Sequence, residues 1–172
     1  MKNLFLPFII FLYFINPSFA EQKMRFIDMN KVISTSKAGS SVLKQLSNLN
    51  NKNIEFLNKE EKKFKEKETK LISQKNIISE DDFKTKVDDL KIEIKSYKKN
   101  RNEKITNFNK LKVDNTNKLL KLINPILVKF SNENNISIIL QKKNLVIGNI
   151  QVDVTDEIIE IINTDIKEFK IK

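Results

Sequence analysis

The chain has 172 residues, enough for one domain or for one domain with an extension. It contains no His and no Cys, which excludes disulfides and removes the commonest general base, the commonest nucleophilic thiol and most zinc ligands. Apolar residues make up 40% and charged residues 31%, with a formal net charge of +10, so the chain can form a core and suits long solvated helices.

The first twenty residues have the pattern of a secretory signal peptide. Lys2 supplies the positive start and residues 4–15 form an uncharged apolar run. Ser18 and Ala20 then place small side chains at the two positions that a signal peptidase reads. The run is short for a membrane span, which needs about 20 residues, and an uncleaved anchor is the alternative. We therefore expect residues 1–20 to be removed and the mature chain to begin at Glu21 outside the cytoplasm.

A short strand is predicted near the start of the mature chain. Residues 24–29 alternate between apolar and polar side chains, which is typical of a half-buried strand. Asn30 follows and can cap the first helix with its side chain.

A seven-residue apolar repeat dominates the middle of the chain, and no Gly or Pro interrupts residues 40–124. This spacing predicts coiled-coil helices. On the first helix the companion seam turns polar at Glu60, Lys67 and Gln74. The apolar repeat positions are Leu43, Leu57, Phe64, Leu71 and Ile78 on the first helix, and Phe83, Leu90, Tyr97 and Leu111, with Val87, Ile94, Phe108 and Leu122, on the second.

The repeat breaks between residues 73 and 79. Ser79 precedes three acidic residues, which suit the positive end of a helix, and its hydroxyl can accept from orphan amides, so a second helix should begin here. Two long helices joined by a short turn run antiparallel. At about 1.5 Å per residue the resulting arm is about 70 Å long. Because the seams are thin, we expect a flexible arm whose helices can splay.

Further elements are predicted after the arm. Residues 136–141 form a β-branched run typical of a strand, residues 142–144 a turn, and residues 145–147 a second short strand. Pro125 should kink the preceding helix or restart it, and Thr155 should cap a final amphipathic helix. The apolar face of that helix carries Ile158, Ile159, Ile161, Ile162, Ile166 and Phe169.

The predicted strands flank the arm in sequence, so they must meet in one body from which the arm projects. The predicted fold class is α+β: a small β-containing oligomerisation body with a long antiparallel α-helical coiled-coil hairpin inserted. We assign residues 21–45 and 115–172 to the body and residues 46–114 to the arm. Three short strands cannot shield a core from water alone, which predicts oligomerisation through the body.

We find no catalytic pattern in the sequence. A P-loop, a dinucleotide-binding glycine motif and a nucleophile elbow are all missing, so we expect a protein that is not an enzyme and uses no cofactor or metal. Neighbouring carboxylates such as Asp88 and Asp89 point to different sides of a helix. Asp153, Asp156 and Glu157 cluster at the start of the last helix, where the helix dipole explains them better than a metal ion does.

The excess positive charge lies in the middle of the chain. Residues 51–130 carry 21 basic and 13 acidic groups, a net charge of +8, against +3 for residues 21–50 and −2 for residues 131–172. The basic stretch 84–104, which includes Tyr97, could contact nucleic acid, but an exported protein meets little of it. Anionic lipid, lipopolysaccharide or acidic segments of a protein fit better, and a plain solvated face is the alternative.

The order of these elements resembles that of the Skp/OmpH family of periplasmic chaperones. The segments that carry the resemblance are residues 26–29 and 36–39 for the opening strand and first helical turn, 136–140 and 144–147 for the closing strands, and 153–155 for the final helix start. Gly148 departs from the family pattern, which often has an aromatic residue there, and the loop 149–152 is shorter.

The resemblance implies a homotrimer whose bodies join through β-structure, with arms around a cavity that holds unfolded outer-membrane proteins in the periplasm without ATP. The implied trimer residues are Phe26, Ile27, Ile138, Leu140 and Val146. A holdase needs dispersed apolar side chains, and the arm supplies them, although most suit the helix seam better. The candidate client-binding residues are Phe56, Leu57, Phe64, Leu71, Phe83, Leu90, Tyr97 and Phe108, with Lys91, Lys95, Lys98 and Lys99. The alternatives are an exported coiled-coil structural or adaptor protein of the envelope, or a lipopolysaccharide binder; a nucleic-acid partner is not expected.

Overall fold

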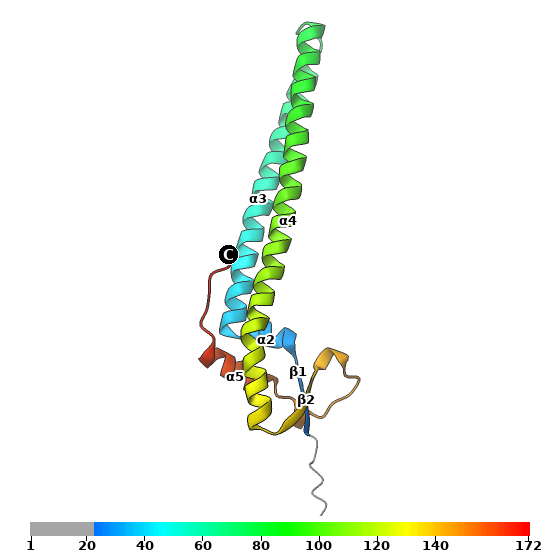
Figure 1. Ribbon diagram of the computed structural model, residues 1–172. Coiled ribbons are helices and arrows are strands. Elements are labelled where there is room, and N and C mark those ends of the chain that lie inside the picture. Colours follow the sequence, from blue (N-terminus) through cyan, green and yellow to red (C-terminus); the bar gives the residue numbers. More distant parts are fainter. Residues whose placement is uncertain (1–22) are drawn as a thin grey trace, which may run out of the picture.

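The structure is a computed structural model that describes residues 23–172. A small body carries a long arm of two helices (Figure 1). The expected signal peptide, residues 1–20, lies outside the described residues. From residue 23 onward, none of the helices combines the length and the apolar character that crossing a bilayer requires.

The sheet of the body joins the two ends of the chain, as predicted. Strands β1 (Lys23–Ile27) and β2 (Ile136–Gln141) pair in parallel, with Phe26 opposite Leu140. Parallel neighbours need a long crossover connection, and here the whole arm serves as that connection. On its other side Phe26 forms a single parallel bridge with Asp153.

The second closing strand predicted at residues 145–147 is wrong. These residues follow a short 3-10 turn, η1 (Lys142–Asn144), and have no regular structure. Within the described residues β2 pairs only with β1, so residues 145–147 have no strand partner, and the Val146 side chain is fully exposed. The chain then passes through a second such turn, η2 (Ile150–Val152), on its way to the last helix.

The first helix, α2 (Met29–Thr35), begins two residues before Lys31, where it would start if Asn30 were its cap. Asp28 is the capping residue, because its carboxylate accepts a hydrogen bond from the amide of Lys31 at 3.0 Å. Asn30 lies inside the helix, so the prediction that it caps the helix is wrong.

Helix α3 (Lys37–Gln74) follows α2 after a single residue, Ser36, whose hydroxyl caps it by accepting from the Gly39 amide at 3.2 Å. Gly39 is needed because the backbones approach closely. A Cβ atom at this position would lie 2.0 Å from the carbonyl oxygen of Ile33 in α2. This junction sets the direction in which the arm leaves the body.

Helix α4 (Glu80–Glu133) starts where the sequence predicted. The Ser79 hydroxyl accepts from the Asp82 amide at 3.1 Å, and three acidic residues occupy the first turn. With 54 residues the helix is about 80 Å long, and its last turns pass into the body. The antiparallel hairpin of α3 and α4 is thereby confirmed (Figure 1).

Pro125 does not restart α4, so of the two predicted outcomes, a kink or a restart, the restart is wrong. The helix runs through this residue without interruption, although a proline there removes the amide that would bond to the carbonyl of Lys121. Ile123 and Ile126 on either side are buried in the core, and their contacts hold the helix across the missing hydrogen bond.

The last helix, α5 (Thr155–Asp165), has Val154 at its cap position and no side-chain cap there, so Thr155 is not the cap that the sequence predicted. Asp153 accepts from both the amide and the hydroxyl of Thr155. The Thr155 hydroxyl in turn accepts from the Asp28 amide at 2.8 Å, which links the start of α5 to the start of α2.

One apolar core holds the body together where α2, α4, α5 and the sheet meet. Ile158 and Ile162, both on the predicted apolar face of α5, are fully buried. The core consists of Ile27, Val32, Ala38, Leu119, Ile123, Ile126, Phe130, Ile136, Val154, Ile158, Ile162 and Ile166. Because these residues come from both ends of the chain, the body can form only after the arm has turned back.

Candidate functional site

The arm is held together by a coiled-coil seam between α3 and α4. The rings of Phe64 and Tyr97 pack across it with their centroids 5.2 Å apart. The Tyr97 hydroxyl also donates to the carboxylate of Glu61 at 2.9 Å. Burial, together with this hydrogen bond and the negative charge of Glu61, raises the pKa of Tyr97, so its hydroxyl remains a donor.

Polar residues in the seam also join the two helices. Lys67 forms an ion pair with Glu93, and the guanidinium of Arg101 lies 3.8 Å from the carboxylate of Glu61. Exposed pairs of this kind contribute little stability each, about 0–1 kcal/mol. The helices nevertheless lie side by side up to the tip (Figure 1), so the arm does not splay in this structure.

Most of the apolar residues predicted to bind clients lie in this seam. Phe56 is the exception, with 42% of its side chain exposed. The half-buried members are Leu57, Phe64, Leu71, Phe83, Leu90, Tyr97 and Phe108. Their first role is therefore to hold α3 and α4 together.

A second set of apolar residues on the arm was missed in the sequence. These side chains are between 40% and 79% exposed and lie outside the repeat positions. They are Ile54, Ile72, Ile77, Ile92, Ile105 and Val113. The seven-residue repeat could have identified them. An apolar residue outside the repeat lies off the seam, and a two-helix arm has no further helix to cover it.

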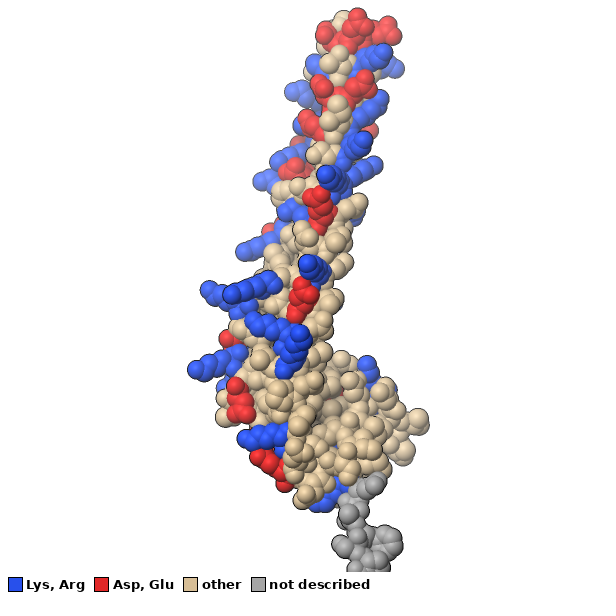
Figure 2. All heavy atoms as spheres, viewed as in Figure 1, with Lys and Arg blue, Asp and Glu red and all other residues tan. Residues whose placement is uncertain are grey.

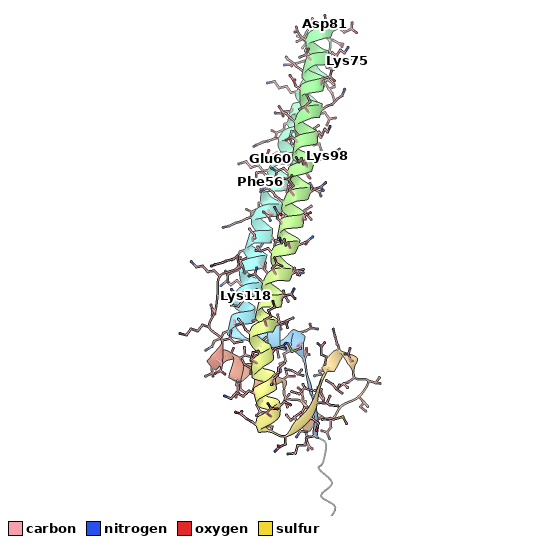
Figure 3. The ribbon with its side chains drawn as sticks, viewed as in Figure 1. Phe56, Glu60, Lys75, Asp81, Lys98 and Lys118 are labelled. Atoms are coloured by element: carbon pink, nitrogen blue, oxygen red, sulfur yellow. The ribbon has the colours of Figure 1, made fainter. Side chains whose placement is uncertain are left out.

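A shallow groove in the middle of the arm joins the two sets. Its volume is about 390 Å³. Phe56 and Glu60 border it from α3 (Figure 3). The full lining is Phe56, Glu60, Phe64, Ile92, Glu93, Ser96, Tyr97 and Asn100. The groove thus offers four apolar side chains beside polar groups, which suits a partly apolar polypeptide.

The predicted basic residues of α4 are exposed. Lys91 pairs with Asp88 at 2.9 Å and lowers the pKa of that carboxyl group, and Lys99 lies 4.0 Å from Glu103. Within residues 23–172, Lys95 and Lys98 have no ion-pair partner. Figure 2 shows basic side chains on both flanks of the arm with acidic ones between them, so the positive charge is not confined to one face.

The residues predicted for the trimer separate into two groups. Phe26 and Ile27 are buried within the single chain. Ile138 and Leu140 on β2 are 47% and 40% exposed, and Val146 in the following loop is fully exposed. In the described part of the chain β2 pairs only with β1, so one edge of the strand is open.

The acidic residues at the start of α5 serve the structure of the body. Asp156 pairs with Lys31 at 2.5 Å, and Asp153 lies 3.4 Å from the ammonium of Lys142. Burial alone would raise the pKa of Asp153, but hydrogen bonds from Thr155 and Lys142 outweigh it and lower the pKa. The described residues contain no group of three or more acidic side chains that could hold a metal ion.

The sequence matches the family described as outer membrane protein (OmpH-like) over residues 23–162. The chain belongs to this OmpH-like family. The match covers the arm and most of the body, so the resemblance noted from the short end motifs is confirmed.

The OmpH-like fold is also found among solved structures. One is a crystal structure from Caulobacter crescentus CB15, described as a candidate outer membrane chaperone (OmpH-like). The TM-score is 0.78, with 14% sequence identity over 88% of this chain and 89% of that chain. At this identity the likeness concerns the fold, and it confirms the predicted body with an inserted helical arm. No curated protein matches the sequence significantly.

Proposed function

We propose that this OmpH-like protein is an ATP-independent holdase of the periplasm, which keeps unfolded outer-membrane proteins from aggregating. The observation that carries the proposal is the set of exposed apolar side chains spread singly along a charged arm. Such dispersed contacts bind many sequences weakly, whereas one large apolar patch would favour a single partner. The chain belongs to the family described as outer membrane protein (OmpH-like). This membership supports outer-membrane proteins as the clients.

Clients contact the arm chiefly at the mid-arm groove and at the exposed side chains off the seam. Phe56 and Ile92 are exposed members of the groove on opposite helices. The lysines at positions 91, 95, 98 and 99 raise the rate at which acidic client segments are met, an effect that salt weakens. The predicted seam residues contribute when the helices part, because that exposes their half-buried faces.

The protein acts as a homotrimer joined through its bodies, residues 21–45 and 115–172, with residues 46–114 as the arms. Support comes from the open edge of β2, where Ile138 and Leu140 are exposed. A neighbouring chain on this edge would pair its free backbone groups and cover these side chains. Three arms would then enclose a cavity that is larger than any groove of a single chain.

The test is light scattering from a denatured outer-membrane β-barrel protein diluted out of urea, with and without residues 21–172. Suppressed scattering without nucleotide, at stoichiometric amounts of trimer, is the expected result. The double variant Phe56→Ser/Ile92→Ser should suppress it less, while Thr69→Ala/Thr85→Ala, which changes exposed hydroxyls elsewhere on the arm, should behave as wild type. A wild-type chain that leaves aggregation unchanged and is monomeric would favour an envelope adaptor instead.

A second candidate function is binding of lipopolysaccharide or anionic lipid through the basic arm. Lys95 and Lys98 favour it, since both are exposed and free of ion pairs among the described residues. Replacing the lysines at 91, 95, 98 and 99 with Gln should then abolish binding to lipopolysaccharide micelles. A variant that still binds these micelles would exclude these lysines as the site, and reduced client capture alone would assign them to client steering.

A further inference from the structure

Residues 166–172, here called the strap, leave α5 and run along the root of the arm beside α3 (Figure 1). Ile166 is buried, Phe169 and Ile171 are partly buried, and the other four residues of the strap are exposed. From Glu168 onward, exposed and covered side chains alternate with the period of two that characterises an extended strand. The strap is therefore an extended segment bound in a site at the root of the arm, on the body side of the junction.

Gln45 of α3 holds the strap by its backbone. Its side-chain nitrogen donates to the carbonyl of Phe169 at 3.0 Å, and its side-chain oxygen accepts from the amide of Ile171 at 3.2 Å. The Phe169 carbonyl and the Ile171 amide lie on either side of Lys170. In a parallel sheet, one residue of the neighbouring strand bonds to the same two backbone groups, so the Gln45 side chain takes the place of such a residue. Because nearly every residue carries such groups, the contact recognises an extended chain and not a particular sequence.

Two residues of α4 complete the site. The buried amide of Asn115 donates to the carbonyls of Leu111 at 2.7 Å and of Lys172 at 3.3 Å. The Lys118 ammonium lies 4.2 Å from the centroid of the Phe169 ring. The strap thus contacts both arm helices at the point where the arm enters the body.

Most of what the strap offers to this site is common to other extended chains. Its hydrogen bonds to Gln45 and Asn115 come from its backbone, and its side chains add two covered apolar groups, Phe169 and Ile171. Strands of outer-membrane β-barrels have apolar residues at alternate positions in the same way. An unfolded protein of this class therefore carries many segments that match the strap.

We infer that the strap occupies a binding site for extended client segments and that a client segment displaces it. The choice of client rests on the proposed function, whereas the site is defined by Gln45, Asn115 and Lys118. The strap contacts both α3 and α4, so its displacement removes contacts from both helices at once. Client capture would thereby favour the separation of α3 and α4 at the arm root.

The first experiment uses the intact chain and measures amide hydrogen exchange of residues 166–172. The probe is a seven-residue peptide of unrelated sequence with apolar residues at alternate positions. Its addition should accelerate exchange at the Ile171 amide, because that amide loses its acceptor on Gln45. The same peptide with a methylated backbone nitrogen at the matching position should have no effect. Unchanged exchange with the unmodified peptide, at concentrations that saturate any binding, would overturn the inference.

The second experiment measures binding of the labelled peptide by fluorescence anisotropy. The variant Phe169→Ser/Ile171→Ser frees the site and should bind the peptide at least about tenfold more tightly than wild type, because the tethered strap competes at high effective concentration. Adding Gln45→Ala to this variant should reverse the gain, whereas Lys44→Ala, at the exposed neighbouring position, should not. Circular dichroism of each variant checks that the body remains folded.

The outcomes separate this site from the proposed function. If only a peptide with the strap's own sequence binds, the strap is an internal brace and the inference fails. If unrelated alternating peptides bind but wild type does not suppress aggregation of a denatured outer-membrane protein, the site stands and the holdase proposal fails.

Discussion

The amide of Asp28 donates a hydrogen bond to the hydroxyl of Thr155 at 2.8 Å, although 127 residues separate them in sequence. Asp28 begins α2 and Thr155 begins α5, so this one contact joins the first and last helices of the body. Thr155 is buried, and its hydroxyl also donates to Asp153. The body is thereby closed through polar groups as well as through its apolar core.

Replacing Thr155 with Val should therefore destabilise the body. The substitution keeps the shape of the side chain but leaves the partly buried Asp28 amide without its acceptor, which costs about 1–3 kcal/mol. Urea denaturation followed by circular dichroism, at a fixed chain concentration, measures the loss. Thr164→Val is the matched control, because that exposed hydroxyl on the same helix bonds only to the Glu160 carbonyl. Equal effects of the two variants would contradict the role assigned to Thr155.

Gly39→Ala should destabilise the protein, contrary to the usual effect of this change in a helix. Alanine favours a helix over glycine by about 1 kcal/mol. Here the added Cβ would lie 2.0 Å from the Ile33 carbonyl oxygen, so α2 and α3 must separate. We expect a net loss of about 2 kcal/mol in the free energy of unfolding, because an overpacking cost of about 3 kcal/mol exceeds the gain in helix propensity. Ser40→Ala, at the next position, which is exposed, should change the free energy of unfolding little. A Gly39→Ala variant that is more stable than the wild type would mean that α2 and α3 move apart at no cost.

Stability should depend on pH through Asp153. Its pKa is lowered in the folded chain, because hydrogen bonds from Thr155 and Lys142 outweigh the effect of burial. The carboxylate therefore contributes stability that is complete above the pKa of an unfolded Asp, about 4, and is lost as the pH falls through the lower folded value. Asp153→Asn keeps an acceptor oxygen but removes this contribution. The free energy of unfolding of the wild type should exceed that of the variant most near neutral pH. Denaturation at several pH values should show this difference shrinking in acid. A difference that stays constant with pH would exclude the carboxylate charge as its cause.

Ile138→Asp/Leu140→Asp should prevent assembly while the single chain still folds. Both side chains are substantially exposed on the open strand β2, so the substitution places no charge in the core of the single chain. Native mass measurement should show monomers, and circular dichroism should retain the helical signal. Ile92→Asp/Ile105→Asp introduces the same charges at exposed positions on the arm and should leave the assembly intact. A trimeric β2 variant would sink the placement of the interface on this edge.

Tyr97 should titrate above the ordinary tyrosine value of about 10. Burial and the hydrogen bond to Glu61 both raise its pKa. It is the sole tyrosine after residue 20 and the chain has no tryptophan, so ultraviolet absorbance of residues 21–172 follows this group alone. Glu61→Gln should move the titration toward the ordinary value. If the variant and the wild type titrate together, the arm helices do not hold these two residues in contact in solution.

The helical arm was predictable from the sequence because its determinants are local. The seven-residue repeat and the Ser79 start signal act over a few neighbouring residues, and the structure has both. The run at 136–141 likewise marked strand β2 at the right residues. The failed predictions have different causes: the Asn30 cap is replaced by a local one, from Asp28 to the Lys31 amide, whereas at Pro125 packing against distant segments decides the outcome. Core contacts of Ile123 and Ile126 carry α4 through Pro125, which local rules treat as a break.

The candidate binding surface depended more on tertiary structure. The repeat already implied that residues such as Phe64 lie in the seam, but only the packed helices show that Phe56 and Ile92 border one groove. No pattern in the sequence linked Gln45 to Phe169, because a side-chain amide that bonds to a distant backbone leaves no periodic signal. The sequence by itself determined the elements, their order and the inserted arm, since these follow from local propensity and repeat. The tertiary structure alone decided which side chains are left exposed and where the strap lies, because both depend on packing between segments far apart in the chain.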